Sequence, residues 1–395
     1  MSLDASSTAG RGLRTLLAVL IVSLNLRGAV TCVGPLLEFI QEEFALSSTA
    51  AGLLSSLPLF AFGFISPYAA PLARKLGMEL AILVALVLLL VGLGLRYLPG
   101  APLLYLGTAL IGIGIAINNV LLPGLLRRDF HHQLATVTAM FTAVLVSVGG
   151  LGSGLAVPLY EIGGWRFSLV AWAIPALLGV LVWLPELRHN TKSDPSPAPA
   201  VKKVSLWRDK LAWQVSLFMG LQSSAFYVMI AWFTSLISDL EGLDAARAGW
   251  ILFVYQIFIL ISVMAVPLFV RALKDQRWIG VGCAAFILAG YLGVYLAPGQ
   301  SMVWMSVMGL GAGGSLVLAI TLFGLRTTNA AQTVGLSGMA QAVGYSMAAV
   351  MPIIIGFLHD LSGGWDVPLL LMLALSVVQV VSGYLSGLPR TVGQH

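Results

Sequence analysis

The chain has 395 residues, of which 58% are hydrophobic and only 9% are charged. Soluble domains usually carry about 25% charged residues, so this composition excludes a soluble globular protein and predicts a membrane protein. The net charge of +5 suggests an acidic partner at first, but the placement of the charges along the chain is better explained by membrane topology than by nucleic-acid binding.

Apolar stretches follow one another along nearly the whole chain. A helix needs roughly 20 apolar residues to cross about 30 Å of hydrocarbon. A membrane β-barrel would instead show alternating ten-residue strands, and nothing in the sequence alternates in that way. We therefore predict an all-α membrane protein with twelve transmembrane helices, at 13–39, 48–73, 79–96, 102–126, 133–160, 167–185, 211–238, 246–270, 278–297, 302–325, 330–357 and 367–388.

Lysine and arginine are distributed unevenly between the two sides of these spans. Seventeen fall on one side and three on the other, namely Arg96, Arg166 and Arg247. Because cytoplasmic loops carry the excess of Lys and Arg, both termini are predicted to be cytoplasmic. We expect a multi-pass protein of the bacterial inner membrane.

The polar, proline-rich and basic segment 185–210 interrupts the apolar pattern. It is typical of a linker, and it separates a six-helix bundle in 1–184 from a second in 211–395. The halves match at an offset of about 200 residues: "GGW" begins at Gly163 and again at Gly363, and "PLARKLGMELAI" corresponds to "PLFVRALKDQRWIG". An even number of spans in each copy makes the repeats parallel, an arrangement that in transporters places the substrate site between the halves near the bilayer midplane.

Four segments carry a resemblance to a known family: "LNLRGAVTCVGPLL", "LLSSLPLFAFGFISPYAAPLARKLGME", "NNVLLPGLLRRDF" and "GLSGMAQAVGY". The chain resembles the major facilitator superfamily over essentially its whole length, and within it the cyanate/2-nitroimidazole transporter family, nearer the nitroimidazole exporters. The resemblance implies two pseudo-symmetric six-helix bundles and transport of a small solute. One departure concerns the loop after the second span, where Gly77 is present but Arg74 replaces the aspartate that usually forms a gate.

Arg27 is a charged residue deep inside a predicted span. Counted from Leu13 at about 1.5 Å per residue, it lies roughly 21 Å along the helix. A charge at that depth costs at least about 2.5–3.5 kcal/mol, so Arg27 should face the cavity between the bundles and find a partner there. Its planar fork of donors suits a nitro group, cyanate or a carboxylate, which favours a substrate anchor. A structural arginine bonded to backbone carbonyls or to a neighbouring Asn is the alternative.

Further polar and aromatic side chains in the spans are candidates for lining the same site. Ser224 falls near the copy position of Arg27, and Gln341 and Tyr345 share a helix face. For any one of them a hydrogen bond between helices is as reasonable as a ligand contact. The candidate substrate-binding residues are Arg27, Asn118, Asn119, Gln222, Ser224, Tyr227, Trp232, Tyr255, Gln256, Gln341 and Tyr345.

Small residues and a proline in the fifth span suggest a mechanical role. Gly150 and Gly154 are spaced for close helix packing, and Pro158 can bend the helix. The segment "GLGAGG" in the tenth span lacks the strand and lysine of a nucleotide-binding loop, so we predict that it packs against neighbouring helices. Arg74, Gly150, Gly154 and Pro158 form the predicted gating and packing set.

No Asp, Glu, Lys or His lies in the middle of any predicted span, which favours facilitated transport, exchange, or movement of a proton with the substrate itself. The leading hypothesis is a secondary carrier that exports a small planar nitro-heterocycle by alternating access. Uptake or exchange of a small anion such as cyanate is the alternative in the same class. A non-transporting sensor would need an attached signalling domain, and a membrane enzyme would need a catalytic cluster; we expect neither. We predict no cofactor, no metal site, a small-molecule substrate and a monomer in the bilayer.

Overall fold

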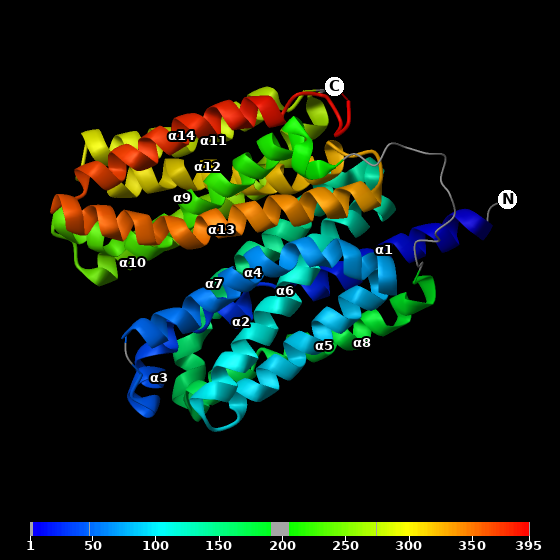
Figure 1. Ribbon diagram of the computed structural model, residues 1–395, viewed down its shortest axis with the longest axis horizontal. Coiled ribbons are helices and arrows are strands. Elements are labelled where there is room, and N and C mark those ends of the chain that lie inside the picture. The colour runs from blue at the N-terminus through cyan, green and yellow to red at the C-terminus, as the bar shows by residue number, and fades with distance from the viewer. Residues whose placement is uncertain (1–2, 47, 191–204, 274, 395) are drawn as a thin grey trace. The chain divides into compact units, whose positions relative to one another are not determined.

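The computed structural model describes the chain except for residues 1–2, 47, 191–204, 274 and 395 (Figure 1). The described residues form helices and contain no strand. They divide into two compact units, Met1–Lys203 and Val204–His395. Most of the predicted linker 185–210 falls within 191–204 and so lies outside the described residues.

Each unit contains the helices of one predicted repeat (Figure 1). Those of the first unit are α1 (Leu3–Ser23), α2 (Gly28–Thr31), α3 (Leu37–Phe44), α4 (Ser48–Leu76), α5 (Met78–Tyr97), α6 (Ala101–Asp129), α7 (Leu134–Val170) and α8 (Ala173–Trp183). Those of the second unit are α9 (Lys210–Glu241), α10 (Ala245–Ala272), α11 (Arg277–Leu296), α12 (Ser301–Leu325), α13 (Ala330–Ser362) and α14 (Asp366–Ser386).

Eleven apolar helical segments of the described chain are long enough to cross a membrane. One of them, His131–His189, has 59 residues and contains the two predicted spans 133–160 and 167–185. Between these spans, Gly163 and Gly164 leave the helical conformation, and Gly164 has a positive φ of 78°. The all-α fold with about twelve membrane crossings is thereby confirmed.

Glycines set the closest helix contacts inside the second unit, as predicted for "GLGAGG". A methyl group at Gly309 would lie 2.6 Å from the carbonyl oxygen of Tyr255 in α10, and one at Gly313 would lie 2.2 Å from that of Ile259. On another side of α12, a methyl group at Gly311 would meet the carbonyl oxygen of Cys283 in α11 at 2.6 Å. Helix α12 therefore packs backbone to backbone against two neighbours, and the packing prediction is confirmed.

The Asn190 side chain fixes the loop between α4 and α5. Gly77 has a φ of 89°, and the Asn190 amide occupies the space where a side chain at 77 would stand. The Asn190 amide nitrogen donates to the Leu76 carbonyl at 2.8 Å, and its oxygen accepts from the Leu80 N–H at 3.3 Å. The chain that follows α8 is thus attached to this loop by two hydrogen bonds.

Candidate functional site

The first apolar span, Gly12–Leu36, is interrupted in its middle. Helix α1 stops after Ser23, residues 24–27 form a turn, and α2 begins at Gly28. In the turn the hydrogen bonds shorten by one residue, so that the Leu26 N–H donates to the Ser23 carbonyl at 3.2 Å. Arg27 is the residue directly before α2, with φ −136° and ψ −43°. The deep arginine therefore stands in a break of the helix, which the apolar pattern did not predict.

The Asn25 side chain joins the interruption to α8. Its side-chain nitrogen donates to the Ile21 carbonyl at 3.2 Å and to the Pro175 carbonyl of α8 at 3.1 Å. Irregular backbone at membrane depth is tolerated where protein surrounds it and takes up its polar groups. Asn25 is only 2% exposed, so it belongs to the support of the break and not to an open cavity.

Helix α2 is held between α7 and Trp172. A methyl group at Gly152 of α7 would lie 2.9 Å from the Gly28 Cα atom and 2.2 Å from the Thr31 hydroxyl oxygen. On the other side, a methyl group at Gly28 would lie 2.1 Å from the Trp172 ring. The stem of half-buried Arg27 passes Gly149, where a methyl group would lie 3.4 Å from its Cδ atom. Glycine at 28 and 152 is therefore a steric requirement of this arrangement.

Arg96, which the charge distribution assigns to the outer side of the membrane, lies in the last turn of α5. Its side chain is 0% exposed. Its Nε donates to the Thr108 hydroxyl at 3.0 Å, and its Nη1 donates to the Ala29 carbonyl of α2 at 2.6 Å. In the sequence, Arg96 counts only as a charge at the end of an apolar span. In the structure, its hydrogen bonds also support the interrupted helix.

The two asparagines of α6 differ in their surroundings. Asn118 is 0% exposed, and neither its amide nitrogen nor its amide oxygen has a hydrogen-bond partner among the described residues. Asn119, the next residue, is half-buried. Because buried amides without a partner are rare, Asn118 has capacity for a ligand or a water molecule. Substrate contact by either asparagine remains a prediction.

In the second unit, α9 and α13 bring several candidates to one crossing (Figure 1). A methyl group at Gly344 would lie 3.4 Å from the Gly220 backbone, so the helices touch there. Gln222 lies two residues after Gly220, and Tyr345 directly follows Gly344. Both are almost fully buried. The structure thus gathers these two residues at one level.

Some candidate substrate-binding residues at this crossing already make side-chain hydrogen bonds, and one of them does not. The Gln222 side-chain nitrogen donates to the Ser223 hydroxyl at 2.7 Å, and that of Gln341 donates to the Ser337 hydroxyl at 2.8 Å. The Ser224 hydroxyl is buried without a hydrogen-bond partner in the part of the chain that the structure describes. Ser224 is therefore the member of this group with unused hydrogen-bonding capacity.

Tyr227 and Tyr255 are linked through Phe226. The Phe226 ring lies edge-on to the Tyr227 ring at 5.2 Å and stacks with the Tyr255 ring at 6.2 Å. Tyr255 is 1% exposed, whereas Tyr227 is half-buried. Gln256 has a buried amide oxygen without a described hydrogen-bond partner. These aromatic residues form one cluster, in which Tyr227 is the more accessible tyrosine.

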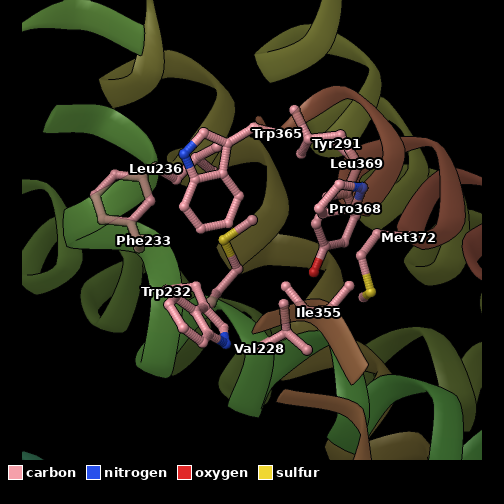
Figure 2. Close-up of a pocket in the computed structure, with 11 residues that line it drawn as sticks. Val228, Trp232, Phe233, Leu236, Tyr291, Ile355, Trp365, Pro368, Leu369 and Met372 are labelled. Atoms are coloured by element: carbon pink, nitrogen blue, oxygen red, sulfur yellow. The ribbon is translucent and has the colours of Figure 1, made fainter. Parts of the chain in front are cut away.

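Trp232 lies in an apolar aromatic pocket and not beside the polar candidates named above. Figure 2 shows Trp232 and Trp365 facing the same space, with Phe233, Tyr291 and Met372 around it. The Trp232 N–H donates to the Pro352 carbonyl at 2.8 Å, and its ring fills the space beside Gly356. With its donor engaged, Trp232 offers a ligand only its ring.

The structure locates each residue of the predicted gating and packing set. No atom of the described residues lies within 4 Å of a methyl group built at Gly150 or Gly154, and the close contact of α7 is made by Gly152 instead. The helix stays regular at exposed Pro158 and loses its helical dihedrals at 163–164. Arg74 is exposed in the last turn of α4. The close contact of α7 within the first unit is thus made by Gly152, and a packing or gating role for Gly150 and Gly154 stays a prediction.

Each unit contains a hydrogen bond from a tryptophan N–H to a carboxylate. The Trp165 N–H donates to Glu43 at 2.7 Å, and the Trp365 N–H donates to Asp239 at 2.8 Å. Both tryptophans end a "GGW" segment. The spacing from Glu43 to Asp239 sets the register between the copies, and it aligns Arg27 with Ser223, one residue before the predicted Ser224.

Glu43 should make the stability of the first unit depend on pH. Hydrogen bonds from the Arg166 guanidinium, together with that from Trp165, hold the pKa of Glu43 below its ordinary value. A carboxyl group with a lowered folded-state pKa stabilises the fold above its unfolded pKa, and this contribution is lost as the pH falls through the folded pKa. The melting temperature of Glu43→Gln should therefore be lower than wild type at pH 6, by no more than about 2 °C for a partly exposed pair.

The difference should shrink toward pH 3, where the wild-type carboxyl is protonated as well. Thermal unfolding between pH 3 and pH 7 measures it, with Glu42→Gln, an exposed neighbour, as the matched control. A constant difference between wild type and Glu43→Gln over the whole range would contradict the linkage.

Comparison with known proteins gives a consistent assignment. The family model for the Major Facilitator Superfamily matches residues 19–349. The 2-nitroimidazole transporter of Escherichia coli (strain K12) is 38% identical over 390 residues, which cover 98% of this chain and 99% of that protein. The cyanate transport protein CynX of the same organism is 27% identical and covers 89% and 91% of the two chains. The solved proton:xylose symporter XylE has a TM-score of 0.78 at 13% identity, covering 95% of each chain.

Proposed function

Because the chain belongs to the Major Facilitator Superfamily of membrane transporters, we propose that it is a secondary carrier that exports 2-nitroimidazole or a closely related planar nitro-heterocycle. The observation that carries the proposal is Arg27 in the interrupted first span: a half-buried arginine directly before α2, with its stem beside Gly149. A nitro group presents two oxygens in a plane, and the guanidinium presents its donors in a plane. The 38% identity to a 2-nitroimidazole transporter over almost the whole chain supports this substrate class.

Arg27 acts in this proposal as the anchor of the nitro group. Asn118 and Ser224, whose buried polar atoms lack described hydrogen-bond partners, are the candidates for further ligand contacts. The remaining predicted polar residues of α9, α10 and α13 are candidates for a polar lining within the second unit. Alternating access then requires that a conformational change open the site around Arg27 to one side of the membrane at a time.

The topology follows from the same proposal. The excess of Lys and Arg in alternate loops supports cytoplasmic termini and a place in the bacterial inner membrane. The carrier functions as a monomer, without catalysis and without a nucleic-acid partner. The lack of acidic side chains in the middle of the spans supports facilitated transport or exchange, or movement of a proton together with the substrate.

A small anion such as cyanate is the second candidate substrate. The similarity to a cyanate transport protein favours it, and a single guanidinium suits a linear anion as well as a nitro group. Net charge separates the two substrates, because a carrier that moves an anion alone also moves current.

A ligand panel tests the proposal directly. Purified wild-type protein is heated with 2-nitroimidazole, imidazole, cyanate, nitrate or acetate. A ligand present at 100 times its Kd adds about 2.7 kcal/mol of stability. We expect stabilisation by 2-nitroimidazole and none by imidazole, which lacks the nitro group. Electrical recording on protein-containing membranes should then show no current if 2-nitroimidazole moves alone or by exchange, whereas a proton that moves with the neutral solute would carry a positive current. Stabilisation by cyanate or nitrate alone would overturn the nitro-heterocycle in favour of the anion.

A further inference from the structure

We propose that Arg96 is a positioning residue that fixes the interruption of the first span and thereby directs Arg27 toward the ligand. The part that concerns Arg27 rests on the proposed function, whereas the part that concerns the interruption does not. Arg96 belongs to α5, yet its guanidinium ends at the backbone of α2. It touches no ligand in this proposal and acts through the geometry of the broken helix.

The guanidinium of Arg96 is oriented by two hydrogen bonds from different nitrogens. Its Nε donates to the Thr108 hydroxyl of α6 at 3.0 Å. The Thr108 hydroxyl itself donates to the Leu104 carbonyl at 2.7 Å, so its lone pair is available to Arg96. The Nη1 then reaches the Ala29 carbonyl at 2.6 Å, a short contact typical of a charged donor. One side chain thus joins three helices: α5, α6 and α2.

The Ala29 carbonyl needs such a donor because α2 is so short. In a longer helix it would accept from the N–H of Val33, but that N–H donates to the Val30 carbonyl instead. The last carbonyls of a helix have no partner within it, and leaving one unpaired away from water is costly. Arg96 therefore stabilises α2 as a separate element.

The second unit contains an uncharged version of the same contact. The Tyr291 hydroxyl of α11 donates to the Ala225 carbonyl of α9 at 3.2 Å. The acceptors Ala29 and Ala225 are as far apart in the chain as Glu43 and Asp239, and the donors Arg96 and Tyr291 are one residue closer, so the two contacts have nearly equivalent positions in the repeats. Helix α9 is continuous through this position. The charged donor with its second hydrogen bond is thus found in the copy whose first helix is broken.

The contact also controls Arg27 because Ala29 is only two residues away. Trp172 and Gly152 hold α2 on two sides, and the Arg96 hydrogen bond holds it at a third point. When this hydrogen bond is lost, α2 can rotate or join α1, and either change turns the Arg27 side chain away from its present direction. Arg96, Trp172 and Gly152, which hold α2, all belong to the first unit, so we expect the effect on α2 to be local to that unit.

Two readouts on full-length protein test the proposal: hydrogen–deuterium exchange of peptides covering 20–33, and the Kd for 2-nitroimidazole. Arg96→Met keeps an apolar stem and removes all donors. We expect its exchange to rise at least tenfold in 20–33 and to stay unchanged in the second unit, with a Kd at least tenfold weaker. Arg96→Lys retains one donor to Ala29 and should restore part of both. Tyr291→Phe, the matched control for loss of a helix-joining hydrogen bond, should leave exchange in 20–33 unchanged.

Every other result of these measurements contradicts one specific part of the proposal. Unchanged exchange in 20–33 overturns the role of Arg96 in the interruption, and a uniform rise in all peptides shows a general stabilising role instead. Faster exchange in 20–33 with an unaltered Kd overturns the effect on Arg27. A wild type that binds no nitro-heterocycle refutes the proposed function, while its exchange pattern still tests the interruption. Should Arg96→Met fail to fold, Thr108→Val, which removes the Nε acceptor at nearly constant volume, should show the same pattern more weakly.

Discussion

Replacing Arg27 with alanine should abolish stabilisation by 2-nitroimidazole and reduce its efflux from proteoliposomes to the rate of empty vesicles. A hydrogen bond to a charged group contributes about 1.5–3 kcal/mol, and every 1.4 kcal/mol changes affinity tenfold. Loss of two such bonds to one nitro group therefore weakens binding by roughly two orders of magnitude or more. The fold should survive, because half-buried Arg27 lies at a break and not within a continuous helix. Thermal unfolding without ligand checks this.

Arg27→Lys separates charge from shape. Lysine keeps the positive charge but replaces the planar fork with a single ammonium group. For a neutral nitro-heterocycle we expect a loss close to that of alanine, whereas a small anion should retain much of its affinity. Lys75→Ala removes an exposed cation from the last turn of α4 and is the matched control. If Arg27→Ala binds 2-nitroimidazole as wild type does, Arg27 is structural and the proposed anchor is wrong.

The positions of the membrane crossings could be predicted because hydropathy depends on local composition. A stretch of about 20 apolar residues must be helical in hydrocarbon, whatever its neighbours are. The interruption at 24–27 could not be predicted in the same way, since Asn25 and Gly28 are poor helix formers but such residues also occur within continuous membrane helices. It depends on partners far away in the chain, namely Trp172 beside Gly28 and Arg96 beside Ala29. The charge of Arg27 singled this residue out in the sequence, but the break in the helix before α2 was not predicted.

Arg96 illustrates a second limit of the sequence. An arginine at the end of an apolar span is normally a topology signal, and the positive-inside count treated it so. The burial of Arg96 depends on the glycines at 92 and 107. A methyl group at Gly107 would lie 3.1 Å from the Arg96 Cγ atom and 2.5 Å from the Gly92 carbonyl oxygen. The two glycines let α5 and α6 approach closely enough to enclose the stem of Arg96, but single-sequence reasoning does not show which glycines face each other.

Substituting alanine at Gly152 should be strongly destabilising, while the same substitution at Gly150 should be neutral or slightly stabilising. The methyl group at 152 would lie 2.8 Å from the Gly28 carbonyl oxygen and 2.2 Å from the Thr31 hydroxyl oxygen. The Thr31 hydroxyl can rotate away, but the Gly28 backbone can move only if α2 moves. Forcing extra atoms into a packed contact costs about 1–3 kcal/mol. At Gly150 the added methyl group meets no described atom within 4 Å, and alanine favours a helix interior by roughly 0.5–1 kcal/mol over glycine.

The two variants differ by two positions in one helix, so composition and helix propensity are matched between them. Thermal unfolding should place Gly152→Ala several degrees below wild type and Gly150→Ala at or above it. Because α2 carries Ala29 and follows Arg27, Gly152→Ala should also weaken 2-nitroimidazole binding in the protein that remains folded. Equal effects of the two substitutions would mean that α7 contacts its surroundings through the Gly150 face, as the sequence spacing first suggested. A stability loss confined to Gly152, together with weaker binding, would connect the packing of α7 to the direction of Arg27.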